Sequence, residues 1–314
     1  MTQNSSSPWP KQAPATLNPA PEPNRLHLVH RWIDEYYGIT AADVLNGGQP
    51  GGSGVGGEAL ASEAFRRMRA MQVAAIDLER GTVDYARLRG SEAYAEYRDF
   101  TRHLSGFDPA ELGSNEERLA FWINLYNALI LDASIAYGVR KTVNEARGFF
   151  WRAAYVVGGR RYSSIEIENG ILRGNATHPA IPVPPFLRDD PRRAFSILPR
   201  DPRVHFAMNC ASRSCPPINF YDPARVDDQL DLATRAFING GGVEIDHAND
   251  RVRLSRIFQW YSPDFGGGPM AILGRRAVLA FIARYLIDEA DRVFVLRPGL
   301  RVSFDPYDWS LNAA

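Results

Sequence analysis

Cysteine is almost missing from this chain, whose 314 residues include only Cys210 and Cys215. Two cysteines form at most one disulfide, so the sequence excludes a small scaffold held together by several disulfides. Hydrophobic residues make up 45% of the chain. They are enough for the core of one large domain or of two modest ones.

An excess of charge is missing as well, because 36 basic residues balance 36 acidic ones. We therefore expect neither a nucleic-acid partner nor a membrane-surface partner. The longest apolar run, 119–137, is interrupted by Asn124, Asn127 and Asp132, which indicates a buried helix rather than a membrane span. The first residues lack the apolar stretch of a secretory signal, so a cytoplasmic location is expected.

The N-terminal part of the chain offers little that a core can bury. Residues 1–24 are rich in Ser, Pro, Asn and Gln and are expected to form a disordered tail. Residues 25–57 are expected to hold a short helix at 27–45 and a Gly-rich linker, and 58–314 a single domain. The apolar side of the short helix is expected to comprise Leu28, Trp32, Ile33 and Tyr36.

Hydrophobic periodicity predicts mainly helices in the rest of the chain. We expect them at 58–78, 85–104, 114–138, after Ser164, at 227–237 and at 271–290. Strands are expected at 204–208 and in two hairpins within 243–254 and 293–304. The predicted fold class is α+β, a predominantly helical single domain packed around a small antiparallel sheet.

The helix within 114–138 has the clearest boundaries. Ser114 and Glu117 have the spacing of a capping box, and Gly138 is typical of a helix C-terminus. Asn124 and Asn127 are three residues apart, hence on one face of an otherwise apolar helix. A buried amide needs partners. The two amides either bind the backbone of a neighbouring loop, which is the commoner role, or line a binding site.

The region after this helix contains polar candidates on two segments. Glu168 and Arg173 follow the predicted start at Ser164; they either form a solvated ion pair or serve a site. Residues 177–199 hold six prolines and are expected to form a lid or binding loop, or else to be disordered.

Both cysteines lie in the segment 201–221, where a reactive site is most expected. The alternation of Val204, Phe206 and Met208 with polar or small residues predicts a short strand that ends at Cys210. The following loop, with two prolines at 216–217, would then present Cys210 and Cys215 at the end of a strand, where folds commonly carry reactive groups.

The residue types in this segment allow a cysteine-dependent hydrolase or acyl transferase, in which a His and an Asn or Asp assist a thiolate. Five extended residues span about 16 Å, so His205 is too far from Cys210 to act as its base. His205 would have to reach Cys215 through a folded loop, or else His178 supplies the base. Arg213 could lower the pKa of a neighbouring thiol.

Two other classes of function remain open. Cys210 and Cys215 could form a redox pair, although they lack the Cys-x-x-Cys spacing. Alternatively, the proline-rich segment and the aromatic residues around Trp260 and Tyr261 could form a groove that binds a peptide or a protein, with the cysteines as small buried residues. A metal site is not expected, because the spacing is not that of structural zinc ligands.

Several segments together resemble the domain of unknown function 547 family. They are FWINLYNA at 121–128, IENGILR at 167–173, DPRVHFAMNC at 201–210 with SCPP at 214–217, LSRIFQWY at 254–261 with DF at 264–265, and YDWSLN at 307–312. The resemblance covers about residues 85–312. It implies no activity. Relatives in plants and animals can carry glutaredoxin-like or coiled-coil segments, none of which this sequence shows. Many relatives have a histidine where this chain has Asn169, which puts a histidine role at that position in doubt.

The leading hypothesis from the sequence is therefore a cysteine-dependent hydrolase or transferase without a cofactor, acting on a small molecule or peptide, with a protein partner as a further option. Its catalytic residues would be Cys215, Cys210, His205 and Asn209. The surrounding polar and binding residues would be Asn124, Asn127, Glu168, Arg173, His178, Ser214, Trp260 and Tyr261.

Overall fold

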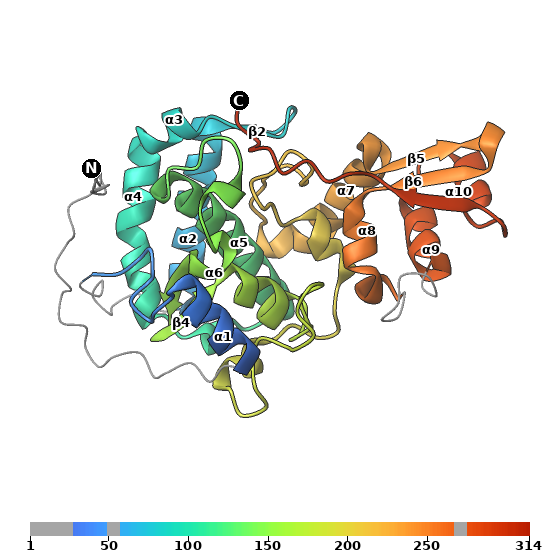
Figure 1. Ribbon diagram of the computed structural model, residues 1–314. Helices are drawn as coiled ribbons and strands as arrows, with labels where there is room; N and C mark the ends of the chain where they lie inside the picture. Colours follow the sequence, from blue (N-terminus) through green and yellow to red (C-terminus); the bar gives the residue numbers. More distant parts are fainter. Residues whose placement is uncertain (1–27, 49–56, 267–274) are drawn as a thin grey trace, which may run out of the picture.

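The computed structural model describes residues 28–48, 57–266 and 275–314. The expected disordered tail and most of the expected Gly-rich linker lie outside these ranges. Figure 1 shows a helical body and, beside it, a second part that contains the sheet β5–β6 and the helices α9 and α10. The predicted α+β class, predominantly helical, is confirmed.

The helical body is built around one long helix, α5 (Asn115–Ala136), which is buried along most of its length. Around it lie the elements that its hydrophobic cluster joins: α2 (Gly57–Ala75), β1 (Ile76–Asp77), β2 (Thr82–Val83), α3 (Tyr85–Arg89), α4 (Glu92–Phe100), α6 (Phe149–Arg152) and the hairpin β3 (Ala154–Val157) with β4 (Arg160–Ser163). The short helix α1 (Leu28–Tyr37) precedes them.

The second part of the fold has its own hydrophobic cluster. The second part comprises β5 (Val243–Asp246), β6 (Arg251–Leu254), α8 (Arg256–Trp260), α9 (Arg275–Tyr285), α10 (Glu289–Val295) and β7 (Arg301–Phe304). Helix α7 (Val226–Phe237) contacts both clusters: its buried Val226 and Leu230 belong to the cluster of the helical body, and Phe237 packs against this one. β5 pairs antiparallel with β6, as the predicted hairpin requires, whereas β7 pairs parallel with β6. The largest sheet is therefore mixed rather than antiparallel.

The boundaries of α5 agree with those predicted. Ser114 and Glu117 form both hydrogen bonds of a capping box, and Gly138 adopts φ 65° just beyond the helix. The helix is long and apolar enough to cross a membrane, but it is mostly enclosed by protein. Its polar residues have partners, as a buried helix requires: Asp132, for example, accepts hydrogen bonds from Arg98 and Tyr94.

Two predicted elements are wrong. Residues 204–208 form no strand but belong largely to a 3-10 helix, η6 (Pro202–Phe206), because Asp201 caps it and Pro202 favours a helical start. The second hairpin does not form: 293–295 end α10, and β7 pairs with β6 instead. The apolar side predicted for α1 is correct only at Ile33, which is buried together with His30, while the three other predicted residues are exposed.

Several predicted helices are shorter than expected. The helix expected at 27–45 ends at Tyr37 as α1. The helix at 85–104 is divided into α3 and α4 at Gly90, because Ser91 caps the second helix, and a 3-10 segment follows Phe100. In the described part of 271–290, α9 ends at Tyr285 and a separate helix, α10, starts at Glu289 after the cap Asp288. In both segments a polar N-cap, Ser91 or Asp288, starts a new helix. Hydrophobic periodicity alone does not reveal such a boundary.

The C-terminal segment joins the two parts of the fold. After β7 the chain runs back to the helical body (Figure 1). There it forms isolated bridges from Ser310 to Thr142, from Leu311 to Ser212 and from Ala313 to Val83. Ser212 lies between the two cysteines in the segment 210–217, which we call the cysteine loop. The C-terminal segment therefore packs directly against this loop.

Candidate functional site at the cysteine pair

The cysteine loop is held by Asn209. Its backbone N–H donates to Oδ1 of Asn127 on α5 at 2.9 Å, and its side-chain Oδ1 accepts the N–H of Ala211 at 2.6 Å. Its Nδ2 donates to the carbonyl of Pro216. These bonds let Ala211 adopt φ 64°, a backbone region that is unfavourable for alanine. Asn209 therefore shapes the loop rather than facing a ligand.

Cys210 and Cys215 form a disulfide with a Cα–Cα distance of 6.3 Å. The N–H of Cys210 donates to Sγ of Cys215 at 3.0 Å. The hydroxyl of Tyr307 lies 3.0 Å from Sγ of Cys215 and 3.3 Å from Sγ of Cys210. The hydroxyl of Ser212 lies 3.3 Å from Sγ of Cys210 and 3.4 Å from Sγ of Cys215. Both cysteines are half-buried, and polar hydrogens surround the Cys215 sulfur.

A cavity of about 310 Å³ opens beside the disulfide; we call it the cysteine cavity. Most of its wall is aromatic, and the polar residues on it are few. It is lined by Tyr126, Asn144, Phe150, Trp151, Ile165, Glu168, His178, His205, Met208, Cys210, Cys215, Pro216, Ile257, Trp260, Tyr261, Tyr307 and Trp309. This is the size of a pocket for a small ligand.

Glu168 supplies the one carboxylate among these lining residues. It lies on a π-helix, η4 (Glu166–Leu172), and is 8% exposed. The hydroxyl of Tyr261 donates to its Oε1 at 2.6 Å, and that of Tyr126 to its Oε2 at 3.3 Å. Burial and the charge of Glu168 raise the pKa of both tyrosines well above 10, so both remain donors. The expected solvated ion pair between Glu168 and Arg173 does not form, since each is buried with other partners.

His205 lines the cysteine cavity but contacts Tyr261 and Asp264. Its ring stacks on Tyr261 at 4.0 Å between centroids, and its Nε2–H donates to Asp264 at 2.9 Å. Asp264 also accepts the Nε–H of Arg173 at 2.5 Å. Burial would raise the pKa of Asp264, but the hydrogen bonds from His205 and Arg173 outweigh it and hold the pKa well below its usual range. Burial lowers the pKa of His205 in spite of Asp264, so the imidazole is neutral.

His178 comes from the proline-rich segment and also lines the cysteine cavity. Its Nδ1 accepts the N–H of Ala180 at 3.1 Å, which leaves the proton on Nε2. Burial lowers its pKa although Glu168 opposes the shift. The segment is anchored by the buried Arg192, which donates to Glu166 of η4 at 2.7 Å. Both histidines of the cavity are therefore uncharged at neutral pH.

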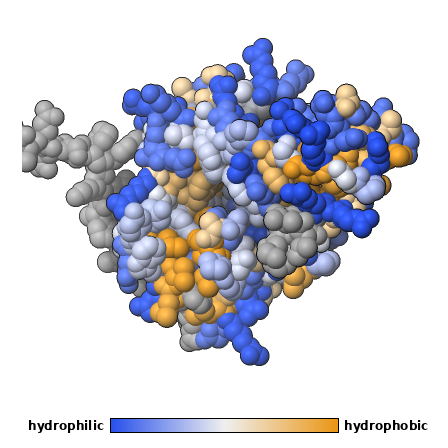
Figure 2. All heavy atoms as spheres, turned by 45° about the vertical axis from the view of Figure 1, so that its right-hand side comes forward, coloured by the Kyte–Doolittle hydropathy of each residue, from blue (hydrophilic) through white to orange (hydrophobic). Residues whose placement is uncertain are grey.

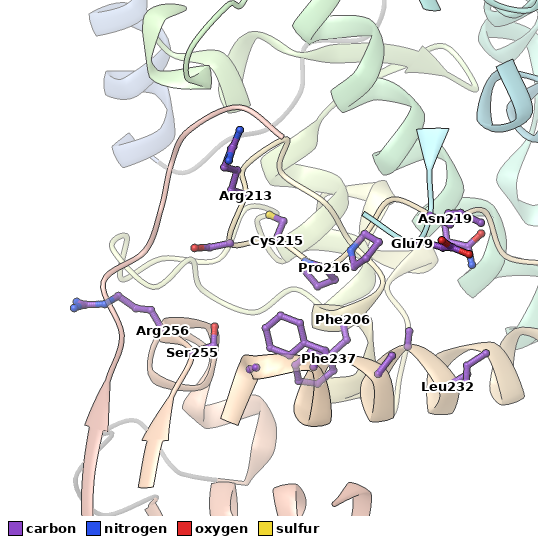
Figure 3. A pocket seen from close by; sticks show the side chains of 18 of the residues that line it. Glu79, Phe206, Arg213, Cys215, Pro216, Asn219, Leu232, Phe237, Ser255 and Arg256 are labelled. Atoms are coloured by element: carbon purple, nitrogen blue, oxygen red, sulfur yellow. The ribbon is translucent and has the colours of Figure 1, made fainter. Parts of the chain in front are cut away.

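A second depression lies on the other side of Cys215; we call it the outer groove. It measures about 750 Å³ and runs between the cysteine loop, α7 and the segment before Tyr307. Figure 3 shows Cys215, Phe206 and Phe237 along it, with Arg213 and Arg256 to one side. The predicted binding residue Ser214 lies on this groove, where its Oγ accepts the N–H of Asp308 at 2.8 Å. On the face shown in Figure 2, hydrophobic patches alternate with hydrophilic surface.

The two asparagines of α5 hold backbone rather than line the cysteine cavity. Asn124 pairs with both the N–H and the carbonyl of Tyr221 at 2.7 Å. Asn127 is fully buried and donates to the carbonyls of Ala207 and Asn219. The commoner role that the sequence suggested for these amides is thus the one observed, and through Asn209 it positions the cysteine loop.

The sequence did not mark Tyr126, which donates to Glu168, or Ser212, whose hydroxyl contacts both sulfurs, as residues of the site. Four further residues were not predicted. Tyr307 and Trp309 lie in the C-terminal segment, Asp264 follows α8, and Trp151 lies on α6. The first three belong to segments that carry the family resemblance, but only the fold brings them to the disulfide and to His205. Groups of three or more His, Cys, Asp or Glu residues arranged to hold a metal ion are absent from the described residues.

The comparison with protein families bears on residues 109–238. They match the family model whose description is "Protein of unknown function, DUF547". The resemblance to the DUF547 family is thereby confirmed. The DUF547 region includes α5, η4, the cysteine loop and α7, whereas Tyr261 and Tyr307 lie beyond it. No curated protein and no solved structure matches this chain.

Proposed function

We propose that this protein is a thiol–disulfide oxidoreductase that uses Cys210 and Cys215 as its redox pair. One observation carries the proposal: the disulfide lies on the wall of a ligand-sized cavity, and the Cys215 sulfur accepts a backbone N–H within reach of a phenol. A structural disulfide needs neither the cavity nor these donors.

The donors act on the reduced form of Cys215. A hydrogen bond to a charged group contributes about 1.5–3 kcal/mol, and one pKa unit corresponds to about 1.36 kcal/mol. The Cys210 N–H and the Tyr307 hydroxyl are therefore both expected to lower the pKa of Cys215, to a value clearly below the usual value of about 8.5. Burial raises the pKa of Tyr307 to about 12, so its hydroxyl keeps its proton.

The reaction proceeds in two exchanges. The Cys215 thiolate attacks one sulfur of a substrate disulfide, whose S–S bond breaks and releases the first thiolate. The thiol of Cys210 then loses its proton to solvent and attacks Sγ of Cys215, which releases the second thiolate and forms the Cys210–Cys215 disulfide. Two electrons pass to the substrate, and an external dithiol reduces the pair again.

The test uses the reduced protein and the neutral probe bis(2-hydroxyethyl) disulfide at pH 6.5. Cys210→Ser should accumulate a mixed disulfide on Cys215, because the resolving thiol is gone, whereas Cys215→Ser should react at the slow rate of an ordinary thiol. Peptide mass spectrometry identifies the modified residue. Equal and slow reaction of both single variants would overturn the proposal, and would favour a binding module with inert cysteines.

A cysteine-dependent hydrolase is the second candidate, and His178 favours it. This neutral imidazole lies in the same cavity as both sulfurs, which suits a general base. The hydrogen-bond partners of the sulfurs are nevertheless Ser212, Tyr307 and the Cys210 N–H rather than a histidine. A hydrolase predicts that His178→Ala abolishes ester turnover by the reduced protein while Cys210→Ser retains it. A redox pair requires both cysteines and tolerates His178→Ala.

A further inference from the structure

The cysteine cavity has an unbalanced charge. Glu168 is the one acidic residue among its lining residues, and these include no lysine or arginine. The two lining histidines have lowered pKa values and are neutral. Arg173, a buried cation at the end of η4, lies with its Cζ 4.7 Å from the ring of Tyr261 and is bound to Asp264. Among the described residues, the hydrogen-bond partners of this carboxylate are the hydroxyls of Tyr261 and Tyr126.

Aromatic rings surround the remaining space. Tyr307 lies 4.8 Å from Trp260 and 4.7 Å from Trp309 between ring centroids. Trp151 and Phe150 complete the lining. The faces of such rings attract cations, most strongly where water is excluded. A buried carboxylate whose hydrogen bonds come from neutral hydroxyls is stabilised further by a ligand that supplies a positive charge.

From these observations we propose that the cysteine cavity binds an organic cation, a substituted ammonium group, between Glu168 and the aromatic wall. This deepens the proposed redox function and rests on it for one consequence: the preferred substrate is a disulfide or thiol that carries an ammonium group near its sulfur. The sulfurs and Glu168 lie on the same cavity of about 310 Å³, so a small molecule can reach both.

The first experiment compares two disulfides of similar length. The reduced protein reacts with cystamine, which carries two ammonium groups, and with neutral bis(2-hydroxyethyl) disulfide. The rate with each disulfide is divided by the rate at which free β-mercaptoethanol reacts with the same disulfide. We expect the normalised cystamine rate to exceed the neutral one by about tenfold. Glu168→Gln removes the charge and keeps one oxygen as an acceptor for a tyrosine hydroxyl, while its Nε2–H can donate to the other phenol oxygen. It should bring the ratio close to one.

The matched control is Glu289→Gln. Glu289 lies on α10 in an exposed pair with Arg292, away from the cavity, so the ratio should remain at its wild-type value. A second variant, Trp309→Leu, retains Glu168 and weakens the aromatic wall; it should lower the ratio severalfold. A wild-type ratio near one, or a ratio unchanged by Glu168→Gln, would overturn the inference.

A second experiment separates this inference from the redox function. The oxidised protein, which cannot act as a nucleophile, is titrated with tetramethylammonium chloride while its tryptophan fluorescence is followed. Saturable binding that Glu168→Gln weakens about tenfold supports the cation site even if no disulfide is reduced. Exchange with neutral disulfide but no saturable binding of the cation leaves the redox function standing and refutes the cation site.

Discussion

Replacing Asn127 by alanine should destabilise the protein, because the Asn127 amide fixes the cysteine loop to α5. The side chain is fully buried and makes hydrogen bonds of 2.8, 3.0 and 2.9 Å with the Ala207 carbonyl, the Asn219 carbonyl and the Asn209 N–H. Its loss leaves these three buried backbone groups without a partner, each at a cost of about 1–3 kcal/mol, less what relaxation recovers. We expect a loss of about 3–5 kcal/mol in the free energy of unfolding.

The assay is thermal unfolding followed by tryptophan fluorescence at pH 7. For a chain of this size the expected loss lowers the midpoint by roughly 5–8 °C. The control is Asn249→Ala: Asn249 is exposed and bonds to Asp246 within a turn, so its replacement should change the stability by about 0.5 kcal/mol or less. If Asn127→Ala is as mild as this control, the amide does not hold the loop and the reasoning fails.

Three further predictions follow from the site and its supports. Because burial lowers the pKa of His205 from 6.5 in the unfolded chain, its contribution to stability is present above pH 6.5 and decreases as the pH falls, so His205→Gln should reduce the loss of thermal midpoint between pH 7 and 5. Gly170→Ala should cost about 1–3 kcal/mol in urea unfolding, because a methyl group there overlaps the Phe186 ring. Tyr307→Phe should raise the Cys215 thiol pKa by about one unit, measured by alkylation rate against pH.

Each of these predictions has a contrary result. An unchanged pH slope in the His205 variant would mean that the imidazole is protonated in the folded protein. Gly106 has open space around it, so Gly106→Ala is the control for Gly170→Ala, and equal stabilities would refute the packing argument. A Cys215 pKa that Tyr307→Phe leaves unchanged would show that the phenol does not stabilise the thiolate.

Local signals predicted the helices well. The capping box at Ser114 and the glycine at 138 defined α5, because the groups that satisfy a helix end lie within a few residues of it. The alternation at 204–208 was misleading, because burial there comes from both the helical body and the second part of the fold. In that setting a 3-10 helix buries Val204, His205 and Phe206 alike. Alternation of apolar and polar residues therefore does not distinguish a strand from a helix at this position.

The site could be predicted only in part. The cysteines, Glu168, His178 and Tyr261 were named from the sequence, and the structure brings them to one cavity. The partners of these residues were not predicted. Tyr307 is 92 residues from Cys215, and it follows a strand, β7, whose parallel pairing with β6 has no local sequence signal. His205 was named as a catalytic residue, but its contact with Asp264 depends on the packing of the segment after α8 onto η6.

The central claim is that Cys210 and Cys215 are a redox pair with an activated thiol. The most direct test is the pH dependence of alkylation of the native protein, resolved by peptide mass spectrometry into separate rates for the two cysteines, with and without prior reduction. We expect no alkylation before reduction and, after it, a Cys215 thiol that reacts with a pKa clearly below about 8.5. A Cys215 pKa at or above 8.5, or cysteines that alkylate without reductant, would contradict it.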